Sequence, residues 1–464
     1  MPDPSLILLP ASRSRAAIPI VPVTSRSWPV IERGLDKSAR TWLKASGFVG
    51  APGKHALLPG PSGKLEKVFY GLGEPAKPAD PFDFARLVRA LPEADYRIEG
   101  ELPDLANAVR GWVLETYRFE RYRNATLPPP RLVCPSQLDR ARLLQAVQAH
   151  FLVRDLVNTP SLDMGPDELE AAARKVAARH HARLRIVAGE RLRREFPMIH
   201  AVGQASPRRP RLIDFTWGPE RAPKVTLVGK GVCFDTGGLD IKPASGMLLM
   251  KKDMGGAANV LGLAQMIMAA KLKLRLRVLI PAVENAIAGN AFRPGDVLTS
   301  RKGIRVEIGN TDAEGRLILG DALALADEET PELLIDMATL TGAARVALGP
   351  DLPPFYTSDD ALAGDLARHA VAANDPLWRM PLWMPYYALI DSSVAEINNA
   401  GDSGFAGSLT AALFLKRFVE RAKSYVHFDI FAWTPMAKPG RPKGGEAQAI
   451  HALLGLMAER YRRT

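Results

Sequence analysis

Three charged residues alternate with other residues in the stretch from Asn310 to Leu317. Asp312, Glu314 and Arg316 stand at every second position. In an extended segment such side chains point to one face, so the spacing predicts two carboxylates and a guanidinium on one side. The Leu- and Ala-rich residues 317–329 predict a helix directly afterwards. A solvated edge strand with cross-paired charges would show the same spacing, so this motif alone does not indicate a site.

A second charged cluster lies upstream, where a predicted strand ends in a glycine-rich segment. Lys230, Asp235 and Lys242 stand in that segment, and Asp253 follows it. Glycines allow close backbone paths beside a ligand. Taken singly, Lys242 would be an ordinary surface lysine. Asp253 alone would be the N-cap of a helix that begins near Gly255.

The two clusters together contain four carboxylates, those of Asp235, Asp253, Asp312 and Glu314. In a buried cleft these groups would raise one another's pKa unless cations neutralised them. Two divalent ions would balance the charge, and pairs of ions roughly 3.5–4 Å apart are a recurrent hydrolase arrangement. If the clusters meet, we expect a hydrolytic site with two metal ions.

Strands and helices alternate from about residue 166 onward. We expect strands at Leu212–Phe215, Val225–Val228, Val278–Pro281 and Leu333–Ala338, and one of the helices at Pro166–Arg179. This alternation predicts an α/β fold with a mixed, largely parallel sheet flanked by helices. In such sheets, sites lie at the carboxyl ends of the strands, where both clusters would fall.

The length of 464 residues is too great for one comfortable core, so we expect two domains. Residues 1–136 would form a smaller N-terminal α/β domain, 137–160 a connecting helix, and 161–464 a larger catalytic domain. Within the first domain, Ala17–Val21 would be an edge strand at best, because Pro19 cannot donate to a strand ladder. A helix is expected over Pro103–Ala125.

Composition narrows the class of protein. Apolar content of 47% and charged content of 24% are typical of a soluble globular protein. No apolar run reaches membrane-spanning length, and the first residues lack the basic region of a signal peptide. Only Cys134 and Cys233 occur, which excludes a disulfide framework and a cysteine-rich zinc site. We therefore expect a cytoplasmic protein that does not enter a membrane.

Four segments resemble the leucyl aminopeptidase, or cytosol aminopeptidase, family of dinuclear metallopeptidases. They are Gly229-Lys-Gly-Val-Cys-Phe-Asp-Thr-Gly-Gly, Met250-Lys-Lys-Asp-Met-Gly-Gly-Ala-Ala, Asn310-Thr-Asp-Ala-Glu-Gly-Arg-Leu and Ala338-Thr-Leu-Thr-Gly-Ala. The third is a near-complete match to the family signature. Secondary matches include Ile397-Asn-Asn and His427-Phe-Asp-Ile. The resemblance is good over about residues 115–435 and poor over the first hundred.

The resemblance implies two divalent metal ions, Mn²⁺ or Zn²⁺, and a set of ligands. Asp235 and Glu314 would bridge the ions. Asp312 would complete the looser site, while Lys230 and Asp253 would complete the tighter one. A lysine ligand must be a neutral amine, so the metals would have to depress the pKa of Lys230.

The resemblance also implies catalytic groups. Lys242 would stay cationic and polarise the scissile carbonyl, which stabilises the tetrahedral oxyanion. Arg316 would hold a bicarbonate that relays the proton of the attacking water. The free amine of the substrate would ligate one metal, which would explain a requirement for an N-terminus.

Five positions are expected to contact the substrate: Met250, Thr339, Leu340, Gly342 and Phe431. Leu340 would lie beside the bicarbonate site and offer its backbone carbonyl. Phe431 stands where the family usually has a small residue. We expect it to reshape the side-chain pocket together with Met250, shifting preference from leucine toward smaller or differently shaped N-terminal residues. An aromatic ring that simply packs the sheet is the alternative.

Two further positions depart from the family pattern. Thr236 replaces a usual serine. Asp240 replaces a small neutral residue, two positions from Lys242. It would be either a solvated loop charge or a group that lowers tolerance for acidic substrates.

The predicted function is that of a metal-dependent aminopeptidase acting on peptides, and the family is typically a homohexamer. Two alternatives remain open. Some members of this family also bind DNA, and a net charge of +11 permits a nucleic-acid-binding regulator, although a solvated surface explains the charge more simply. A metal-dependent amidase acting on non-peptide substrates has the same motifs.

Overall fold

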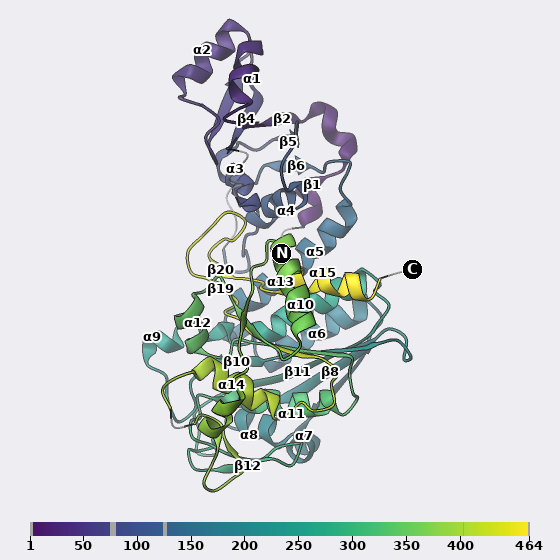
Figure 1. Cartoon of the computed structure of the whole chain (residues 1–464), viewed down its shortest axis with the longest axis vertical. Coiled ribbons are helices and arrows are strands. Elements are labelled where there is room, and N and C mark those ends of the chain that lie inside the picture. Colours follow the sequence, from purple (N-terminus) through teal and green to yellow (C-terminus); the bar gives the residue numbers. More distant parts are fainter. Residues whose placement is uncertain (1–2, 75–79, 124–127, 402, 463–464) are drawn as a thin grey trace. The chain divides into compact units, whose positions relative to one another are not determined.

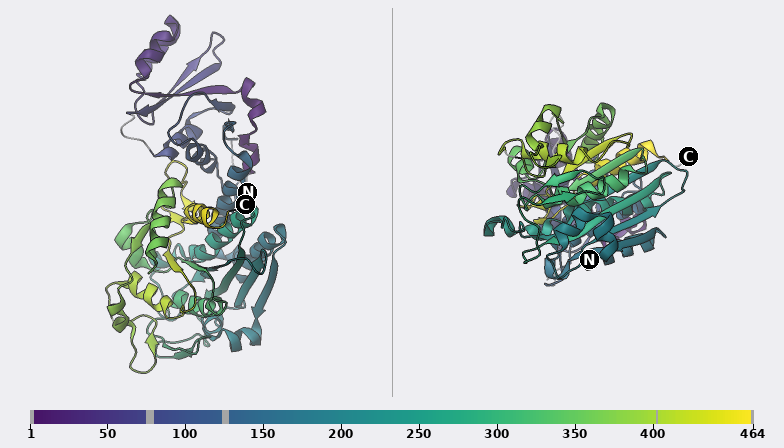
Figure 2. Two further views of the ribbon diagram at one scale, coloured as in Figure 1. Left: turned by 45° about the vertical axis from the view of Figure 1, so that its right-hand side comes forward. Right: turned by 90° about the horizontal axis from the view of Figure 1, so that it is seen from below.

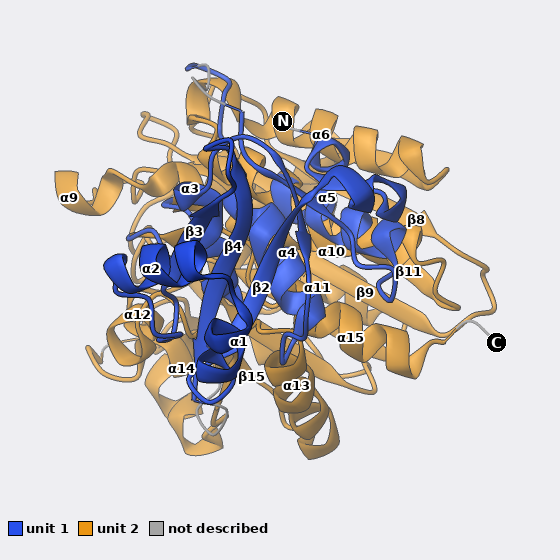
Figure 3. Ribbon diagram, turned by 90° about the horizontal axis from the view of Figure 1, so that it is seen from above, with its two compact units in different colours: residues 1–151, 436–443 blue, residues 152–435, 444–464 orange. Residues whose placement is uncertain are grey.

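The computed structural model describes residues 3–74, 80–123, 128–401 and 403–462. It divides into two compact units, coloured separately in Figure 3. Unit 1 consists of Met1–Phe151 and Met436–Lys443, and unit 2 of Leu152–Pro435 and Gly444–Thr464. The boundary falls within helix α5 (Arg140–Asn158). Each unit has a sheet with helices (Figure 1), which confirms the predicted two-domain α/β class.

The sheet of unit 1 has six strands in the order β1-β6-β5-β2-β4-β3, all parallel except the pair β3–β4. The strands are β1 (Leu8–Leu9), β2 (Ile18–Thr24), β3 (His55–Pro59), β4 (Leu65–Gly73), β5 (Asp95–Ile98) and β6 (Arg131–Val133). The α-helices are α1 (Trp28–Gly34), α2 (Lys37–Ala45), α3 (Leu87–Ala90) and α4 (Leu105–Glu115). Trp112 of α4 is fully buried, and its ring centroid lies 5.6 Å from that of Phe84 and 6.2 Å from that of Tyr96.

The prediction that Pro19 confines its strand to an edge is wrong, because β2 lies between β5 and β4. Each neighbour pairs with only part of β2, β5 with Ile18–Ile20 and β4 with Ile20–Thr24. The carbonyl of Ile20 accepts a hydrogen bond from Glu99 on the β5 side. By alternation, Pro19 faces the β4 side before that pairing begins. Its missing N–H therefore leaves no gap in the ladder.

The helix expected over Pro103–Ala125 is also wrong in length. Helix α4 ends at Glu115, and Ala125 lies outside the described residues. The guanidinium of Arg118 donates to the carbonyls of Glu115 and Tyr117, both at 3.0 Å. These carbonyls would otherwise bond the amides of a continuing helix. A side chain that satisfies them allows the chain to leave the helix.

The main sheet of unit 2 is larger and mixed. Its strands follow the order β16-β15-β18-β14-β9-β11-β8-β7, and β10 pairs with β11. The pairs joining β18, β14, β9, β11 and β10 are parallel, whereas β15–β18, β11–β8 and β8–β7 are antiparallel. The strands are β7 (Arg183–Ala188), β8 (Arg211–Trp217), β9 (Lys224–Gly229), β10 (Gly231–Asp235), β11 (Arg275–Asn285), β14 (Leu333–Ala338), β15 (Pro354–Tyr356), β16 (Trp378–Met380) and β18 (Tyr425–Asp429).

Helices lie on both faces of this sheet (Figure 2). Besides α5, the α-helices described in unit 2 are α6 (Pro166–Arg179), α7 (Gly189–Glu195), α8 (Pro197–Gly203), α9 (Ala244–Met247), α10 (Gly255–Ala269), α11 (Glu314–Asp327), α12 (Gly342–Leu348), α13 (Asp360–Ala372), α14 (Gly407–Lys416) and α15 (Ile450–Arg460). Smaller ladders join β12 (Val297–Thr299), β13 (Arg305–Glu307) and β17 (Ile397–Asn398), and also β19 (Trp433–Thr434) and β20 (Gly444–Gly445). Among the described residues, no helix combines the length and apolar character needed to cross a membrane.

Candidate metal centre and active site

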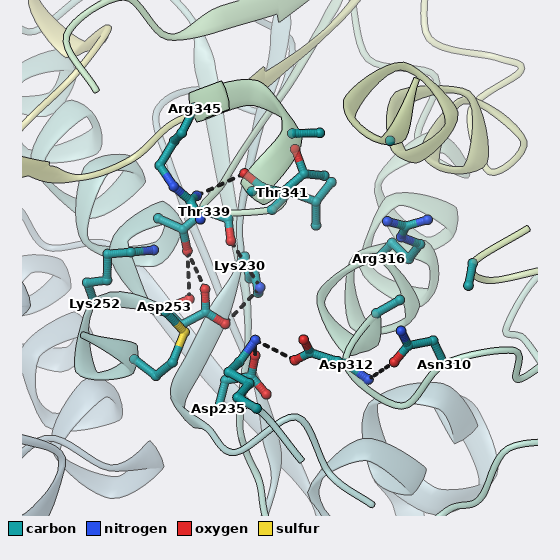
Figure 4. Close-up of a pocket in the computed structure, with 18 residues that line it drawn as sticks. Lys230, Asp235, Lys252, Asp253, Asn310, Asp312, Arg316, Thr339, Thr341 and Arg345 are labelled. Atoms are coloured by element: carbon teal, nitrogen blue, oxygen red, sulfur yellow. Dashed lines mark hydrogen bonds and ion pairs between the residues drawn. The ribbon is translucent and has the colours of Figure 1, made fainter. Parts of the chain in front are cut away.

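The segments that follow neighbouring parallel strands meet at one edge of the unit 2 sheet. Lys230 directly follows β9, Asp235 ends β10, Thr339 follows β14 and Asp429 ends β18. Because these strands run in the same direction, their carboxyl ends share an edge. A cavity of about 300 Å³ opens there (Figure 4). Its lining includes Lys230, Asp235, Lys242, Met250, Lys252, Asp253, Asn310, Asp312, Arg316, Thr339, Leu340, Gly342 and Arg345.

The two charged clusters of the sequence come together at this cavity. Carboxylate oxygens of Asp235, Asp312 and Glu314 all lie within 4.8 Å of one another. Asp235 is 2% and Glu314 1% exposed. Asp312 is partly exposed, and three acids this close can bind a metal ion.

The prediction of an extended Asp312–Arg316 segment is wrong. Glu314 is the first residue of α11, and Asp312 lies in the preceding turn. The side-chain carbonyl of Asn310 accepts the N–H of Asp312 at 2.7 Å, an Asx turn that ends the extended path. Asn399 fixes the same turn, since its amide nitrogen donates to the carbonyl of Asn310 at 2.8 Å. The acids therefore converge through a turn and the first turn of a helix.

Lys230 lies among the acids of both clusters. Its Nζ is 2.8 Å from Asp253 Oδ2 and 3.0 Å from Glu314 Oε1, and it donates to the carbonyl of Thr339 at 3.1 Å. Burial alone would lower the pKa of this amine, but the surrounding carboxylates of Asp253, Glu314 and Asp235 outweigh burial and raise it. The chain itself thus holds Lys230 as a cation. A neutral, ligating amine would require the added positive charge of metal ions.

Asp253 is not the N-cap that its position suggested. Met254 precedes the first residue of α10 and makes no side-chain cap. The Asp253 carboxylate instead accepts the hydroxyl of Thr339 at 2.8 Å. Since Asp253 also pairs with Lys230, its side chain belongs to the acid cluster.

Lys242 reaches the same acids from the loop after β10. Its Nζ lies 2.9 Å from Asp235 Oδ2 and forms an ion pair with Asp312. Burial would lower the pKa of Lys242, but these carboxylates raise it, so the amine remains a cation at the cavity wall.

The lysines do not neutralise the acids fully. Burial, together with the charge of Asp235, raises the pKa of Glu314 to about 8 and that of Asp312 to about 6. Among the described residues, Asp253 Oδ2, Asp312 Oδ1 and Glu314 Oε1 are buried, form ion pairs with these lysines and accept no hydrogen bond of good geometry. Buried oxygens normally have such partners. Carboxylate oxygens left in this state fit divalent cations, so the residues present suit a metal centre.

Arg316 lines the cavity beside this cluster and is 8% exposed. Its Nη1 donates to the carbonyl of Asn399 at 2.6 Å, whereas its buried Nε has no hydrogen-bond partner among the described residues. Burial lowers its pKa to about 10, which leaves the guanidinium charged at neutral pH. A small anion could therefore bind here.

The predicted substrate contacts divide into two groups. Met250, Thr339, Leu340 and Gly342 line the cavity. Phe431 is not among the lining residues. Its ring lies against two side chains that are, with its centroid 5.1 Å from Lys252 Nζ and 4.8 Å from Arg345 Cζ.

Several residues that build this site had no role predicted from the sequence. Asp429 accepts hydrogen bonds from the backbone of Leu340 and Thr341, both at 3.1 Å, and from the hydroxyls of Thr341 at 2.6 Å and Ser408 at 2.9 Å. Asn285 donates to Asp235 at 2.9 Å. Asp429 stands inside the matched His427-Phe-Asp-Ile segment, which was the available indication. Asn285 stands in no matched motif.

Two family models match this chain. The catalytic-domain model of the cytosol aminopeptidase family matches residues 151–454. A model described as the M17 aminopeptidase N-terminal domain matches residues 18–135, a region in which the sequence motifs gave little resemblance.

Individual relatives and structures support the same family. A probable cytosol aminopeptidase of Roseiflexus castenholzii is 39% identical over 372 residues, 75% of each chain. The crystal structure of cytosol aminopeptidase from Coxiella burnetii is 46% identical, with a TM-score of 0.93, and covers 98% of this chain and 99% of its own. The bottromycin maturation enzyme BotP in complex with Mn is 30% identical, with a TM-score of 0.87, and covers 96% and 100%. The chain therefore belongs to the cytosol aminopeptidase family.

Proposed function

We propose that this chain is a metal-dependent aminopeptidase that hydrolyses the N-terminal residue from peptides. One observation carries the proposal. Carboxylate oxygens of Asp235, Asp312 and Glu314 lie close enough together to bind the same metal ion. The cations Lys242 and Arg316 line the cavity beside them. Such a site can bind metal, stabilise negative charge and hold an anion that accepts a proton.

The proposed centre holds two divalent ions. Asp235, Glu314, Asp312, Asp253 and, as a neutral amine, Lys230 would hold them. When bound, the ions would act as Lewis acids and lower the pKa of the attacking water. Mn²⁺ is supported by its presence in the BotP complex, and Zn²⁺ suits the same oxygen and amine donors.

The chain's own cations would act on the peptide. Lys242 would donate to the scissile carbonyl oxygen and stabilise the charge that develops on it. Arg316 would hold a bicarbonate, which can act as a general base. Met250, Thr339, Leu340 and Gly342 would contact the substrate from the cavity wall.

We also propose that the enzyme is cytoplasmic and assembles as a homohexamer. The names of its relatives, cytosol aminopeptidases, support the compartment. The family resemblance supports the assembly. Light scattering coupled to size-exclusion chromatography tests it, since a hexamer of the 50.5 kDa chain and a monomer differ sixfold in mass.

A metal-restoration assay tests the proposed function. Enzyme stripped with a chelator should not hydrolyse leucyl-p-nitroanilide, and activity should return with Mn²⁺ or Zn²⁺. Glu314→Gln should bind less metal in a calorimetric titration and should not recover. Full activity of the chelated enzyme, or equal metal binding by the variant, would contradict the proposal.

A further inference from the structure

Two cationic side chains line the cavity on the side opposite Arg316 (Figure 4). Lys252 ends the short 3₁₀ helix Met250–Lys252 and is 2% exposed. Arg345 extends from α12, and its Nη1 donates to the carbonyl of Thr341 at 2.8 Å. Neither residue is among the predicted metal ligands.

Neither cation has an ion-pair partner in the part of the chain that the structure describes. Lys230 and Lys242 each contact two carboxylates at less than 4.0 Å. No such pair involves Lys252 or Arg345 among the described residues. Lys252 is buried, and a buried cation without an ion-pair partner is costly, whereas Arg345 is partly exposed. This wall of the cavity therefore presents positive charge that no ion pair among the described residues neutralises.

Phe431 holds these two cations against one ring. Its centroid lies 5.1 Å from Lys252 Nζ and 4.8 Å from Arg345 Cζ, both within cation–π range. The ring is itself fixed, because the backbone N–H groups of Phe431 and Ala432 both donate to Gln448 Oε1 at 2.9 Å. A ring placed in this way keeps the ammonium and the guanidinium near each other at the cavity wall.

The same wall carries the residues expected to contact the substrate side chain. Met250 is the first residue of the 3₁₀ helix that ends at Lys252, and Gly342 begins the helix that carries Arg345. An apolar leucine side chain placed here would leave both cations unpaired. A side-chain carboxylate would neutralise them and could accept charge-assisted hydrogen bonds.

We propose that this enzyme prefers peptides with an acidic N-terminal residue, whose side-chain carboxylate lies between Lys252 and Arg345. The inference rests on the proposed aminopeptidase function and adds its substrate class. Phe431 acts here as a positioning residue for the two cations and does not itself bind the acid.

The test compares glutamyl- and glutaminyl-p-nitroanilide, two substrates of nearly the same shape that differ in side-chain charge. Neither has a C-terminal carboxylate, so any preference comes from the N-terminal side chain. We expect kcat/KM to be about tenfold or more higher for the glutamyl substrate, the range of a hydrogen bond to a charged group. Lys252→Met and Arg345→Met should each lower this ratio by about tenfold, and Lys252→Arg should restore most of it.

Lys251→Met is the matched control. The Lys251 amine donates to the carbonyl of Asn158 at 2.7 Å and lies 5.5 Å from the Trp433 ring centroid, and it does not line the cavity. This variant should keep the glutamyl-to-glutaminyl ratio of the wild type. Because the ratio is measured within one preparation, partial unfolding of a variant does not alter it.

The outcomes separate the two proposals. Hydrolysis of leucyl and glutaminyl substrates with no glutamyl preference would overturn the acidic specificity and leave the aminopeptidase function intact. If the enzyme preferred the glutamyl substrate but neither Lys252→Met nor Arg345→Met changed that preference, the assignment of acidic specificity to these two cations would be wrong. Hydrolysis of no anilide with either metal would reject the proposed function itself.

Discussion

Asp240 and Thr311 are joined by hydrogen bonds that involve the backbone N–H and the side chain of each residue. Its carboxylate accepts the backbone N–H of Thr311 at 2.7 Å, and its own N–H donates to the Thr311 hydroxyl oxygen at 2.9 Å. The hydroxyl in turn donates to the carbonyl of Gly237 at 2.6 Å. Asp240, one of the departures from the family pattern, does not line the cavity. Its hydrogen bonds to Thr311 connect the loop that carries Lys242 to the turn that carries Asp312.

Replacing Asp240 should loosen that connection. Asp240→Ala removes the acceptor of the Thr311 N–H. Because Asp240 is exposed, this should cost about 0.5–1.5 kcal/mol of unfolding free energy and lower kcat through misplacement of Lys242. Asp240→Asn keeps a side-chain oxygen and should retain most of the stability and most of the kcat of the wild type. Thermal denaturation and kcat for leucyl-p-nitroanilide measure the two effects. Equal kcat values for Asp240→Ala and the wild type would show that the connection does not position Lys242.

Asp429 should be essential for the segment after β14. Its buried carboxylate accepts four hydrogen bonds from Leu340, Thr341 and Ser408. Asp429→Ala would leave these donors buried and unpaired, at roughly 1–3 kcal/mol for each donor that water cannot reach. We expect strong destabilisation and a loss of kcat, measured by urea denaturation and steady-state kinetics.

Ser408→Ala is the comparison for that variant, since it removes one of the four donors and keeps the carboxylate. It also removes the acceptor of the buried Tyr356 hydroxyl, which lies 2.7 Å from Ser408 Oγ. It should cost roughly 1–3 kcal/mol, less than Asp429→Ala, and leave kcat nearly unchanged. If Asp429→Ala were no less stable than Ser408→Ala, the carboxylate would not organise this segment.

Metal binding should stabilise the fold. The buried oxygens of Asp253, Asp312 and Glu314 lack good hydrogen bonds among the described residues, and ions that bind only the folded chain shift the unfolding equilibrium. At a free Mn²⁺ concentration of about 100 times Kd, the gain should be ~2.7 kcal/mol. Differential scanning calorimetry with and without Mn²⁺ measures it. An identical shift in Asp235→Asn would place the ion elsewhere.

His427 and Asp336 should make stability depend on pH. Burial alone would lower the pKa of His427, but the Asp336 carboxylate, 2.7 Å from its Nδ1, outweighs burial and raises the pKa above 6.5. A raised folded-state pKa gives stability that is fully present below about pH 6.5 and is lost as pH rises through the folded value.

The comparison with His427→Asn isolates this contribution. The difference in unfolding free energy between the wild type and the variant should shrink as pH increases from 6 to 9, as measured by urea denaturation at fixed metal concentration. A difference that does not change with pH, or grows with it, would mean that His427 is neutral in the folded chain.

Strongly periodic elements were predictable from the sequence. Helix α6 spans the expected Pro166–Arg179, and β14 spans the expected Leu333–Ala338. Apolar periodicity specifies such segments locally, without information from distant residues. The meeting of the two charged clusters was also foreseeable, because parallel strands place their carboxyl ends on one edge.

Features that depend on distant partners were not predictable. The place of Pro19 within the sheet depends on where β4 and β5 begin and end. The local path at Asp312 depends on Asn399, and the role of Asp253 depends on Thr339 and Lys230. The two cations around Phe431 come from segments far apart in the chain, so the sequence indicated an altered pocket but not its charge.

Peptides that differ only at their N-terminus test the proposed aminopeptidase activity most directly. Enzyme loaded with Mn²⁺ or Zn²⁺ would be given a panel of short peptides, each with a free amine or an acetylated one, and the released amino acids would be identified by mass spectrometry. An aminopeptidase should release one residue at a time from the free peptides and none from the acetylated ones. Equal cleavage of the free and acetylated peptides, or cleavage at an internal bond, would contradict the proposed aminopeptidase activity.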